Sequence, residues 1–144
     1  MKILFLSVGK PKQPEASALF EEYSGRIRRI GIHVDAQWVK ESDMEREAAA
    51  LINALPHRCR AIALDRSGTM LDSRQLASRI EEWTTPRGAF IVGGPLGLHS
   101  ALLERADRIW SLSSLTFPHD LARAVLSEQI YRALTLVRNI PYHK

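Results

Sequence analysis

The sequence predicts an α/β domain with a mostly parallel sheet and helices on both faces. Short apolar runs typical of buried strands alternate along the chain with segments whose apolar residues recur at helical spacing. Loops rich in glycine or serine follow two of these runs, as in α/β proteins that hold a ligand at the ends of their strands. Because the chain has 144 residues, we expect one domain spanning residues 1–144.

The first half of the chain shows three strand patterns and two helix patterns. The strands are expected at Lys2–Val8, His33–Val39 and Arg60–Leu64, and the helices at Glu15–Ile30 and Asp43–Leu55. Gly31 is a stop signal for the first helix. Ser42-Asp43-Met44-Glu45 has the pattern of a capping box before the second helix. A turn at residues 65–68 is expected to end the third strand.

The second half continues the alternation. We expect a helix from Asp72 or Ser73 to Trp83, a strand at Phe90–Val92, a helix at Ser100–Ala106, a strand at Ile109–Leu112 and a final helix from Asp120 to about Asn139. Asp120, which follows His119, is expected to cap the final helix.

The final helix is apolar over most of its circumference. Its polar stripe comprises Glu128, Arg132, Thr135 and Asn139. Such a helix is covered on more than one side, either by its own domain or by another subunit, and we favour another subunit. Arg123 lies inside the apolar sector, where a guanidinium needs a carboxylate, a phosphate or a ligand as partner.

Composition limits the class of protein. Hydrophobic residues make up 45% of the chain and charged residues 25%, as in ordinary globular proteins. The single cysteine, Cys59, excludes an intrachain disulfide and a cysteine-based zinc site, and the five histidines lack metal-ligand spacing. No apolar stretch approaches membrane-spanning length, and the N-terminal apolar run Ile3–Val8 is too short for the apolar core of a signal peptide. We expect a cytoplasmic protein that binds neither metal nor membrane.

The net charge of +4 comes from an excess of arginine and lysine. The basic residues form three groups along the chain, which are Arg26, Arg28 and Arg29, then Arg58 and Arg60, then Arg132, Arg138 and Lys144. Because these groups lack interleaved aromatic residues and a long basic run, charge alone indicates an ordinary solvated surface. It permits a nucleic-acid partner without establishing one.

Two loops are candidates for ligand binding. Gly93-Gly94-Pro95-Leu96-Gly97 matches neither a dinucleotide fingerprint nor a phosphate-binding loop, and by itself it reads as a tight turn. Residues 112–117 follow the next strand, and their backbone amides and carbonyls can pair with an adenine edge. Two such loops that converge make a pocket. A serine hydrolase is disfavoured because the chain lacks a G-x-S-x-G elbow.

Several motifs together resemble one family. They are KILFLSVGK, FEEYSGRI, GGPLGL, LSSLTFPHDLARAVLSEQIYRA and the ending NIPYHK. The chain is similar over essentially its whole length to the bacterial RlmH family. Members are small SPOUT-class methyltransferases that methylate N3 of a pseudouridine in helix 69 of 23S ribosomal RNA. The resemblance implies an α/β fold with a C-terminal trefoil knot, S-adenosylmethionine as cofactor, and a homodimer that acts on ribosomal RNA in the assembled ribosome.

The resemblance also implies roles for particular residues. Those expected at the cofactor are Leu64, Gly93, Leu112, Ser113, Ser114, Leu115, Thr116 and Phe117. We expect His119, Arg123 and Tyr142 to take part in catalysis, and Arg132 and His143 to contact RNA. Pairing of Arg132 with Glu128 four residues earlier is an equally good account of that arginine.

The chain departs from the family pattern at two positions. Leu96 replaces an acidic residue in the glycine loop, and Phe117 replaces a leucine. Leucine accepts no hydrogen bond, so the detail of the cofactor or substrate site differs near Leu96. Three other functions stay open, namely a SPOUT enzyme acting on another RNA such as transfer RNA, a non-catalytic RNA-binding protein, and, least favoured, a dinucleotide-dependent oxidoreductase.

Overall fold

The computed structural model describes residues 1–144 and alternates five strands with five helices. The strands are β1 (Lys2–Val8), β2 (His33–Val39), β3 (Arg60–Met70), β4 (Gly88–Val92) and β5 (Arg108–Ser111). The helices are α1 (Pro14–Arg29), α2 (Met44–Ala54), α3 (Ser73–Thr84), α4 (Ser100–Arg105) and α5 (His119–Val137). All strand pairs are parallel, in the order β2-β1-β4-β3-β5. The predicted α/β class is therefore confirmed, with a sheet that is parallel throughout.

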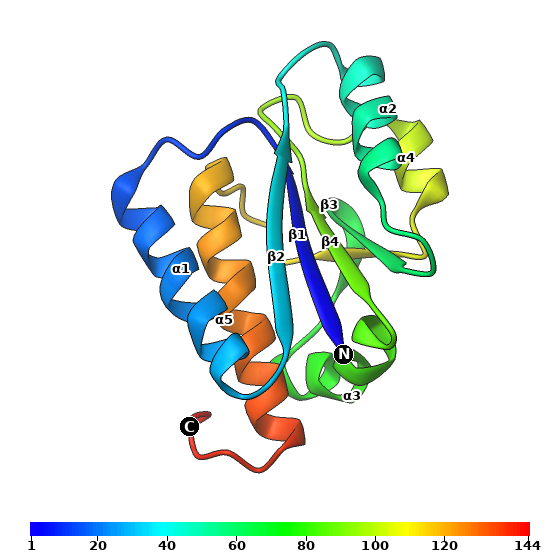
Figure 1. Ribbon diagram of the computed structural model, residues 1–144. Helices are drawn as coiled ribbons and strands as arrows, with labels where there is room; N and C mark the ends of the chain where they lie inside the picture. The colour runs from blue at the N-terminus through cyan, green and yellow to red at the C-terminus, as the bar shows by residue number, and fades with distance from the viewer.

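Alternate residues of the strands enter two apolar cores on opposite faces of the sheet. In β1, Ile3 and Phe5 belong to the core beneath α1, α3 and α5, whereas Leu4 and Leu6 belong to the core beneath α2 and α4. Figure 1 shows α1 and α5 side by side on one side of the sheet and α2 and α4 together on the other. Burial on both faces explains why the strands read as continuous apolar runs.

The turn predicted at residues 65–68 is wrong, because β3 continues to Met70. Leu64 and Thr69 both pair with Trp110 of β5, so the residues between them form a bulge. Within the bulge, Oδ2 of Asp65 accepts a 3.0 Å hydrogen bond from the Ser67 amide. A Cβ on Gly68 would lie 2.6 Å from the Ile109 backbone, so only glycine allows this approach of β3 to β5.

The helix boundaries follow the predicted signals with one correction. Gly31 ends α1 with a φ of +91°, as expected. Asp72 caps α3 in a reciprocal capping box with Gln75. The capping box predicted at residues 42–45 is wrong, because Asp43 caps α2 by accepting a 2.9 Å hydrogen bond from the Arg46 amide.

Helix α5 is covered mainly within its own chain. It lies against the sheet between α1 and α3, and Leu126, Ile130 and Leu134 are fully buried. Thr135 is also buried, with its hydroxyl donating to the Arg132 carbonyl at 2.6 Å, so it does not belong to an exposed polar stripe. The apolar circumference of α5 therefore does not by itself require a second subunit. The trefoil knot implied by the resemblance stays a prediction, since strand order alone does not establish it.

Candidate functional site

A cavity of about 650 Å³ lies at the C-terminal ends of β4 and β5 and beside the bulge of β3, the strand between them. It is lined by residues 64–66 of β3, 92–98 after β4, 111–113 and 115–118 after β5, and by His119 and Ala122 of α5. Ligands of open parallel sheets bind at this edge because the loops there converge. The two loops singled out in the sequence thus form one site.

The glycine loop is a compact turn whose backbone approaches itself closely. The Gly97 amide donates a 3.0 Å hydrogen bond to the Gly94 carbonyl, and Gly97 has a φ of +80°. A Cβ on Gly93 would lie 3.0 Å from the Gly97 backbone. Leu96 is 63% exposed at the tip of the turn, where its side chain borders the cavity. The loop needs glycine at positions 93 and 97, whereas position 96 is free to vary.

The serine loop is shaped by side chains and leaves its backbone available. Ser111 Oγ donates to the Ser113 carbonyl at 2.9 Å, and Ser113 Oγ accepts from the Leu115 amide at 3.0 Å. None of the backbone–backbone hydrogen bonds outside the regular elements involves residues 112–117. Their amides and carbonyls can therefore pair with a polar ligand edge.

Seven of the eight predicted cofactor residues line the cavity. They are Leu64, Gly93, Leu112, Ser113, Leu115, Thr116 and Phe117. Ser114 belongs to the same loop but is not among the lining residues. Sequence reasoning missed Asp65 and Arg66, which also line the cavity. Their position directly after a buried apolar run was the available signal, although the sequence predicts a turn at both residues.

His119 lies at the cavity and is held by the carboxylate that follows it. Its Nδ1 is 2.8 Å from Oδ1 of Asp120. Oδ2 of Asp120 accepts hydrogen bonds of 2.7 Å from the amides of Lys12 and Gln13. The predicted helix cap is therefore wrong, because Pro118 occupies the cap position and Asp120 ties α5 to the loop after β1. Burial opposes ionisation of Asp120, but these hydrogen bonds outweigh it and lower the pKa of the carboxyl group.

Arg123 is buried one turn further along α5 and does not line the cavity. Only 6% of it is exposed, and its guanidinium carbon lies 4.0 Å from the centre of the Phe20 ring. It forms no ion pair, and its Nε has no hydrogen-bond partner. The expectation of a carboxylate, phosphate or ligand partner is not met within the chain, and an aromatic face takes that place. Burial lowers the pKa of Arg123, with Asp120 and Glu21 opposing that effect.

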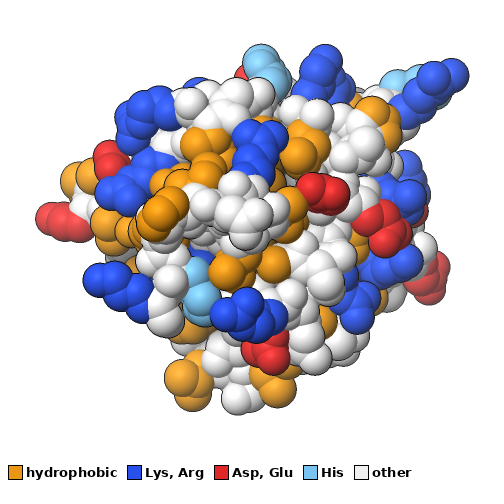
Figure 2. Space-filling view, turned by 90° about the horizontal axis from the view of Figure 1, so that it is seen from below, with side chains coloured by type: hydrophobic (Ala, Val, Ile, Leu, Met, Phe, Trp, Pro, Cys, Tyr) orange, Lys and Arg blue, Asp and Glu red, His pale blue; other side chains and the backbone are white.

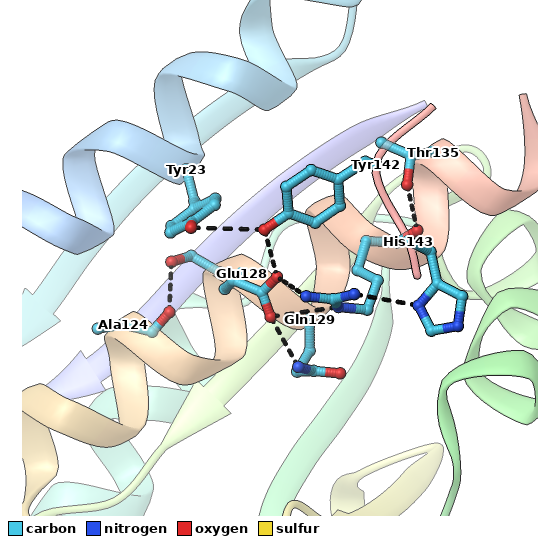
Figure 3. A network of polar contacts seen from close by, with 9 residues as sticks. Tyr23, Ala124, Glu128, Gln129, Thr135, Tyr142 and His143 are labelled. Atoms are coloured by element: carbon cyan, nitrogen blue, oxygen red, sulfur yellow. Dashed lines mark hydrogen bonds and ion pairs between the residues drawn. The ribbon is translucent and has the colours of Figure 1, made fainter. Parts of the chain in front are cut away.

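A second polar cluster fixes the C-terminal tail to the second half of α5 (Figure 3). This tail cluster comprises Tyr23, Glu128, Arg132, Tyr142 and His143. The Tyr142 hydroxyl donates to Glu128 Oε2 at 2.6 Å and lies 3.4 Å from the Tyr23 hydroxyl. Glu128 also pairs with Arg132 at 2.9 Å, which confirms the predicted ion pair, and Arg132 lies 3.0 Å from Nδ1 of His143. Burial and the bond to Glu128 raise the pKa of Tyr142.

The tail cluster lies along the second half of α5, away from the cavity. His119 begins the helix, and Glu128 and Arg132 are nine and thirteen positions further on, which corresponds to about 14 Å and about 20 Å along the axis. Within one chain the structure therefore brings His119 to the predicted cofactor residues, but not Tyr142, Arg132 or His143.

The basic residues do not form one large patch. Figure 2 shows lysine and arginine side chains spread around the rim of the face seen from below, with acidic side chains between some of them. The first and third sequence groups do meet, because Arg138 donates to the Ile30 carbonyl and Arg26 lies 6.0 Å from the centre of the Tyr142 ring. No helix is long and apolar enough to cross a membrane, and no cluster of three metal-ligating side chains is present.

Comparison with known proteins decides the family. The family model described as "Predicted SPOUT methyltransferase" matches residues 1–143. The chain belongs to this family. The SPOUT methyltransferase assignment agrees with the parallel sheet and with a cavity bordered by the loops after β4 and β5.

Curated relatives match the chain over nearly their whole length. "Ribosomal RNA large subunit methyltransferase H" of Thioalkalivibrio sulfidiphilus is 36% identical over 159 residues, covering 100% of this chain and 99% of the relative. The protein of the same name from Geobacter sulfurreducens is 39% identical, covering 99% of each chain. The one from Rubrobacter xylanophilus is 42% identical, covering 85% of this chain and 86% of the relative.

A solved structure shows that the fold of this SPOUT chain recurs at low sequence identity. It is described as "Structural insights into the 2-OH methylation of C/U34 on tRNA". It is 16% identical, has a TM-score of 0.51, and the match covers 92% of this chain and 97% of that one. At this identity the likeness concerns the fold alone.

Proposed function

We propose that this chain is an S-adenosylmethionine-dependent methyltransferase that modifies N3 of a pseudouridine in helix 69 of 23S ribosomal RNA. The observation that carries the proposal is the convergence of the two family loops on one cavity at the ends of β4 and β5. Relatives named as ribosomal RNA large subunit methyltransferases, 36% to 42% identical to this chain, support ribosomal RNA as the substrate class.

The residues at the cavity fit the cofactor. A volume of about 650 Å³ falls within the range of sites for small ligands. The amides and carbonyls of residues 112–117 that are not bound by the serine hydroxyls suit an adenine edge, and the apolar side chains of Leu64, Leu112 and Phe117 suit its faces. On the glycine-loop side of the cavity, Gly93 adds no side chain, and a Cβ there would come into tight contact with the Gly97 backbone. When bound, S-adenosylmethionine supplies an activated methyl group on a sulfonium.

The protein's own contribution is to position the RNA base and to manage one proton. An imide N3–H is a weak acid, so its proton must leave as the nitrogen attacks. His119 is the ionisable ring at the cavity, and we assign it to this step. Arg123, buried and unpaired one turn away, stabilises the developing negative charge through its field without touching the base. Holding both reactants in line supplies about 7–11 kcal/mol when the geometry is near attack.

A homodimer completes the site in this proposal. Because Tyr142 is held by Glu128, about 14 Å from His119 along α5, we infer that the Tyr142 that acts at the cavity comes from a second copy. We propose that the tail of one subunit approaches the cavity of the other. Arg132 and His143 then contact RNA that spans both subunits, in the cytoplasm and on the assembled ribosome.

The proposal is tested by labelled methyl transfer to three substrates, with cofactor binding measured separately by calorimetry. Ribosomes from a strain lacking the protein, free ribosomal RNA and transfer RNA are compared. We expect label in the ribosomal substrates and none in transfer RNA. Label in transfer RNA alone would favour another SPOUT substrate, and RNA binding without cofactor binding would indicate a non-catalytic protein.

A further inference from the structure

We propose that Asp120 is a positioning residue that fixes the tautomer of His119, so that Nε2 of His119 is the acceptor of the N3 proton. The inference rests on the proposed function and deepens it. It adds a residue that the family resemblance assigned to no role, and it states which atom of His119 takes the proton.

Asp120 is built into the structure as a carboxylate. It is 7% exposed, and Oδ2 accepts from two backbone amides, those of Lys12 and Gln13, both at 2.7 Å. Two convergent N–H donors leave no place for a proton on that oxygen, and they favour the ionised form. The remaining oxygen, Oδ1, faces His119 Nδ1 at 2.8 Å.

An ionised carboxylate only accepts hydrogen bonds, so the proton in this contact belongs to Nδ1 of His119. In the neutral ring, Nε2 then carries the lone pair. Nε2 is buried and has no hydrogen-bond partner in the chain, although His119 lines the cavity. A buried ring nitrogen without a partner is rare and suggests a partner supplied by a ligand.

Charged residues lie near His119 on two elements, α5 and β3. Asp120 and Arg123 lie on α5 itself, and Asp65 and Arg66 of β3 border the same cavity. Of these, only Asp120 forms a hydrogen bond with the ring. The tautomer of His119 is therefore set by Asp120.

The reaction balances with this assignment. The N3–H bond breaks and its proton goes to Nε2, while its electron pair forms the new bond to the methyl carbon. The bond between that carbon and sulfur breaks, and its electrons stay on sulfur as a neutral thioether. Asp120 stabilises the imidazolium that forms, and the ring then returns the proton to solvent.

The test is Asp120→Asn, which keeps the shape and reverses the tautomer. The amide oxygen must face the amides of Lys12 and Gln13, since an NH₂ group there would meet two donors. The NH₂ group then donates to Nδ1 of His119, and the ring proton moves to Nε2. Asp107→Asn is the matched control, because Asp107 Oδ2 also accepts from a backbone amide, that of Ala61 at 2.7 Å, and does not border the cavity.

The tautomer is read directly from ¹⁵N shifts of the His119 ring by NMR, without substrate. We expect protonation at Nδ1 in the wild type and in Asp107→Asn, and at Nε2 in Asp120→Asn. In methyl transfer, kcat of Asp120→Asn should fall by about 10²-fold or more, with KM for both substrates close to that of the control. The melting temperature should fall only slightly, because the amide oxygen keeps both backbone hydrogen bonds and only the charge of Asp120 is lost. Imidazole should partly restore His119→Ala.

Protonation at Nε2 in the wild type would overturn the proposal, as would a wild-type kcat in Asp120→Asn with the reversed tautomer. If the melting temperature of Asp120→Asn fell so far that loss of folded protein accounted for the loss of kcat, Asp120 would have only a structural role. That result would also overturn the proposal. A wild-type protein that methylates no RNA would instead refute the proposed function, and the proton-acceptor role with it, while the spectrum still reported the tautomer.

Discussion

The Tyr142 hydroxyl donates a 2.6 Å hydrogen bond to Oε2 of Glu128, and this contact holds the C-terminal tail against the middle of α5, about 14 Å along the axis from His119. The tail is thus ordered within its own chain, at a place where it cannot touch that chain's cavity. In the proposed homodimer, a tail held in this way is available to the cavity of the second subunit.

Subunit mixing tests this shared site. Gly93→Val removes the cavity and Tyr142→Ala removes the tail contact, so each homodimer should be nearly inactive. In a heterodimer, the intact cavity of one subunit meets the intact tail of the other. Because half of the randomly mixed dimers are heterodimers with one complete site, about a quarter of the wild-type methyl transfer should return. Mixed activity no higher than that of the parents would argue against a site built from two subunits.

Gly93→Val should abolish cofactor binding while leaving the protein folded. A Cβ at Gly93 would lie 3.0 Å from the Gly97 backbone, so the added side chain projects from the glycine loop into tight contact at the cavity wall. Isothermal calorimetry with S-adenosylmethionine measures the loss. Gly25→Ala in α1 is the control, because its Cβ would meet nothing closer than 3.7 Å; it should bind normally and gain roughly 0.5–1 kcal/mol of stability.

Arg123→Met should separate stability from activity. The substitution removes an unpaired buried charge and loses a contact with Phe20 of the cation–π type, worth about 0.5–2 kcal/mol. We expect the free energy of unfolding in urea to stay within about 1 kcal/mol of the wild type or to rise, while methyl transfer falls. Exposed Arg79→Met should change neither quantity. A large loss of stability in Arg123→Met would show instead that the guanidinium is structurally required.

The decrease in the free energy of unfolding at acid pH should depend on Asp120. Its pKa is lowered in the folded state, so the unfolded chain binds more protons below the usual aspartate value of about 3.9. The stabilisation is therefore complete above about pH 5 and is lost as the pH falls through the folded pKa. Denaturation in urea between about pH 5 and pH 2 should give a flatter curve for Asp120→Asn than for the wild type. Superimposable slopes would contradict the lowered pKa.

The fold could be predicted largely because a parallel sheet buried on both faces leaves continuous apolar runs. The runs at Lys2–Val8 and Phe90–Val92 both form strands. The extension of β3 to Met70 could not be predicted in this way. Its residues 65–68 have the composition of a turn, and what keeps them in the strand is the pairing of Thr69 and Met70 with β5, a contact made only in the tertiary structure.

The candidate site, like the fold, could be predicted from the sequence only in part. The loops at residues 93–97 and 112–117 could be located because each directly follows a strand, and the ends of parallel strands meet at one edge. The role of Asp120 could not be predicted from the sequence, because its partners Lys12 and Gln13 are 108 and 107 residues away in the chain. The local sequence predicts that Asp120 caps the final helix. In the structure its carboxylate instead accepts hydrogen bonds from two backbone amides of a distant loop.

The central claim is most directly tested by mass spectrometry of the modified nucleoside. Ribosomes from a strain lacking this protein are incubated with the purified protein and S-adenosylmethionine, and the helix 69 fragment of 23S ribosomal RNA is digested and analysed. We predict one added methyl group on N3 of a pseudouridine in that fragment, absent without the protein and strongly reduced with Asp120→Asn. An unmodified helix 69 with methylation at another nucleotide would contradict the assigned substrate, and no methylated nucleoside at all would contradict the assigned activity.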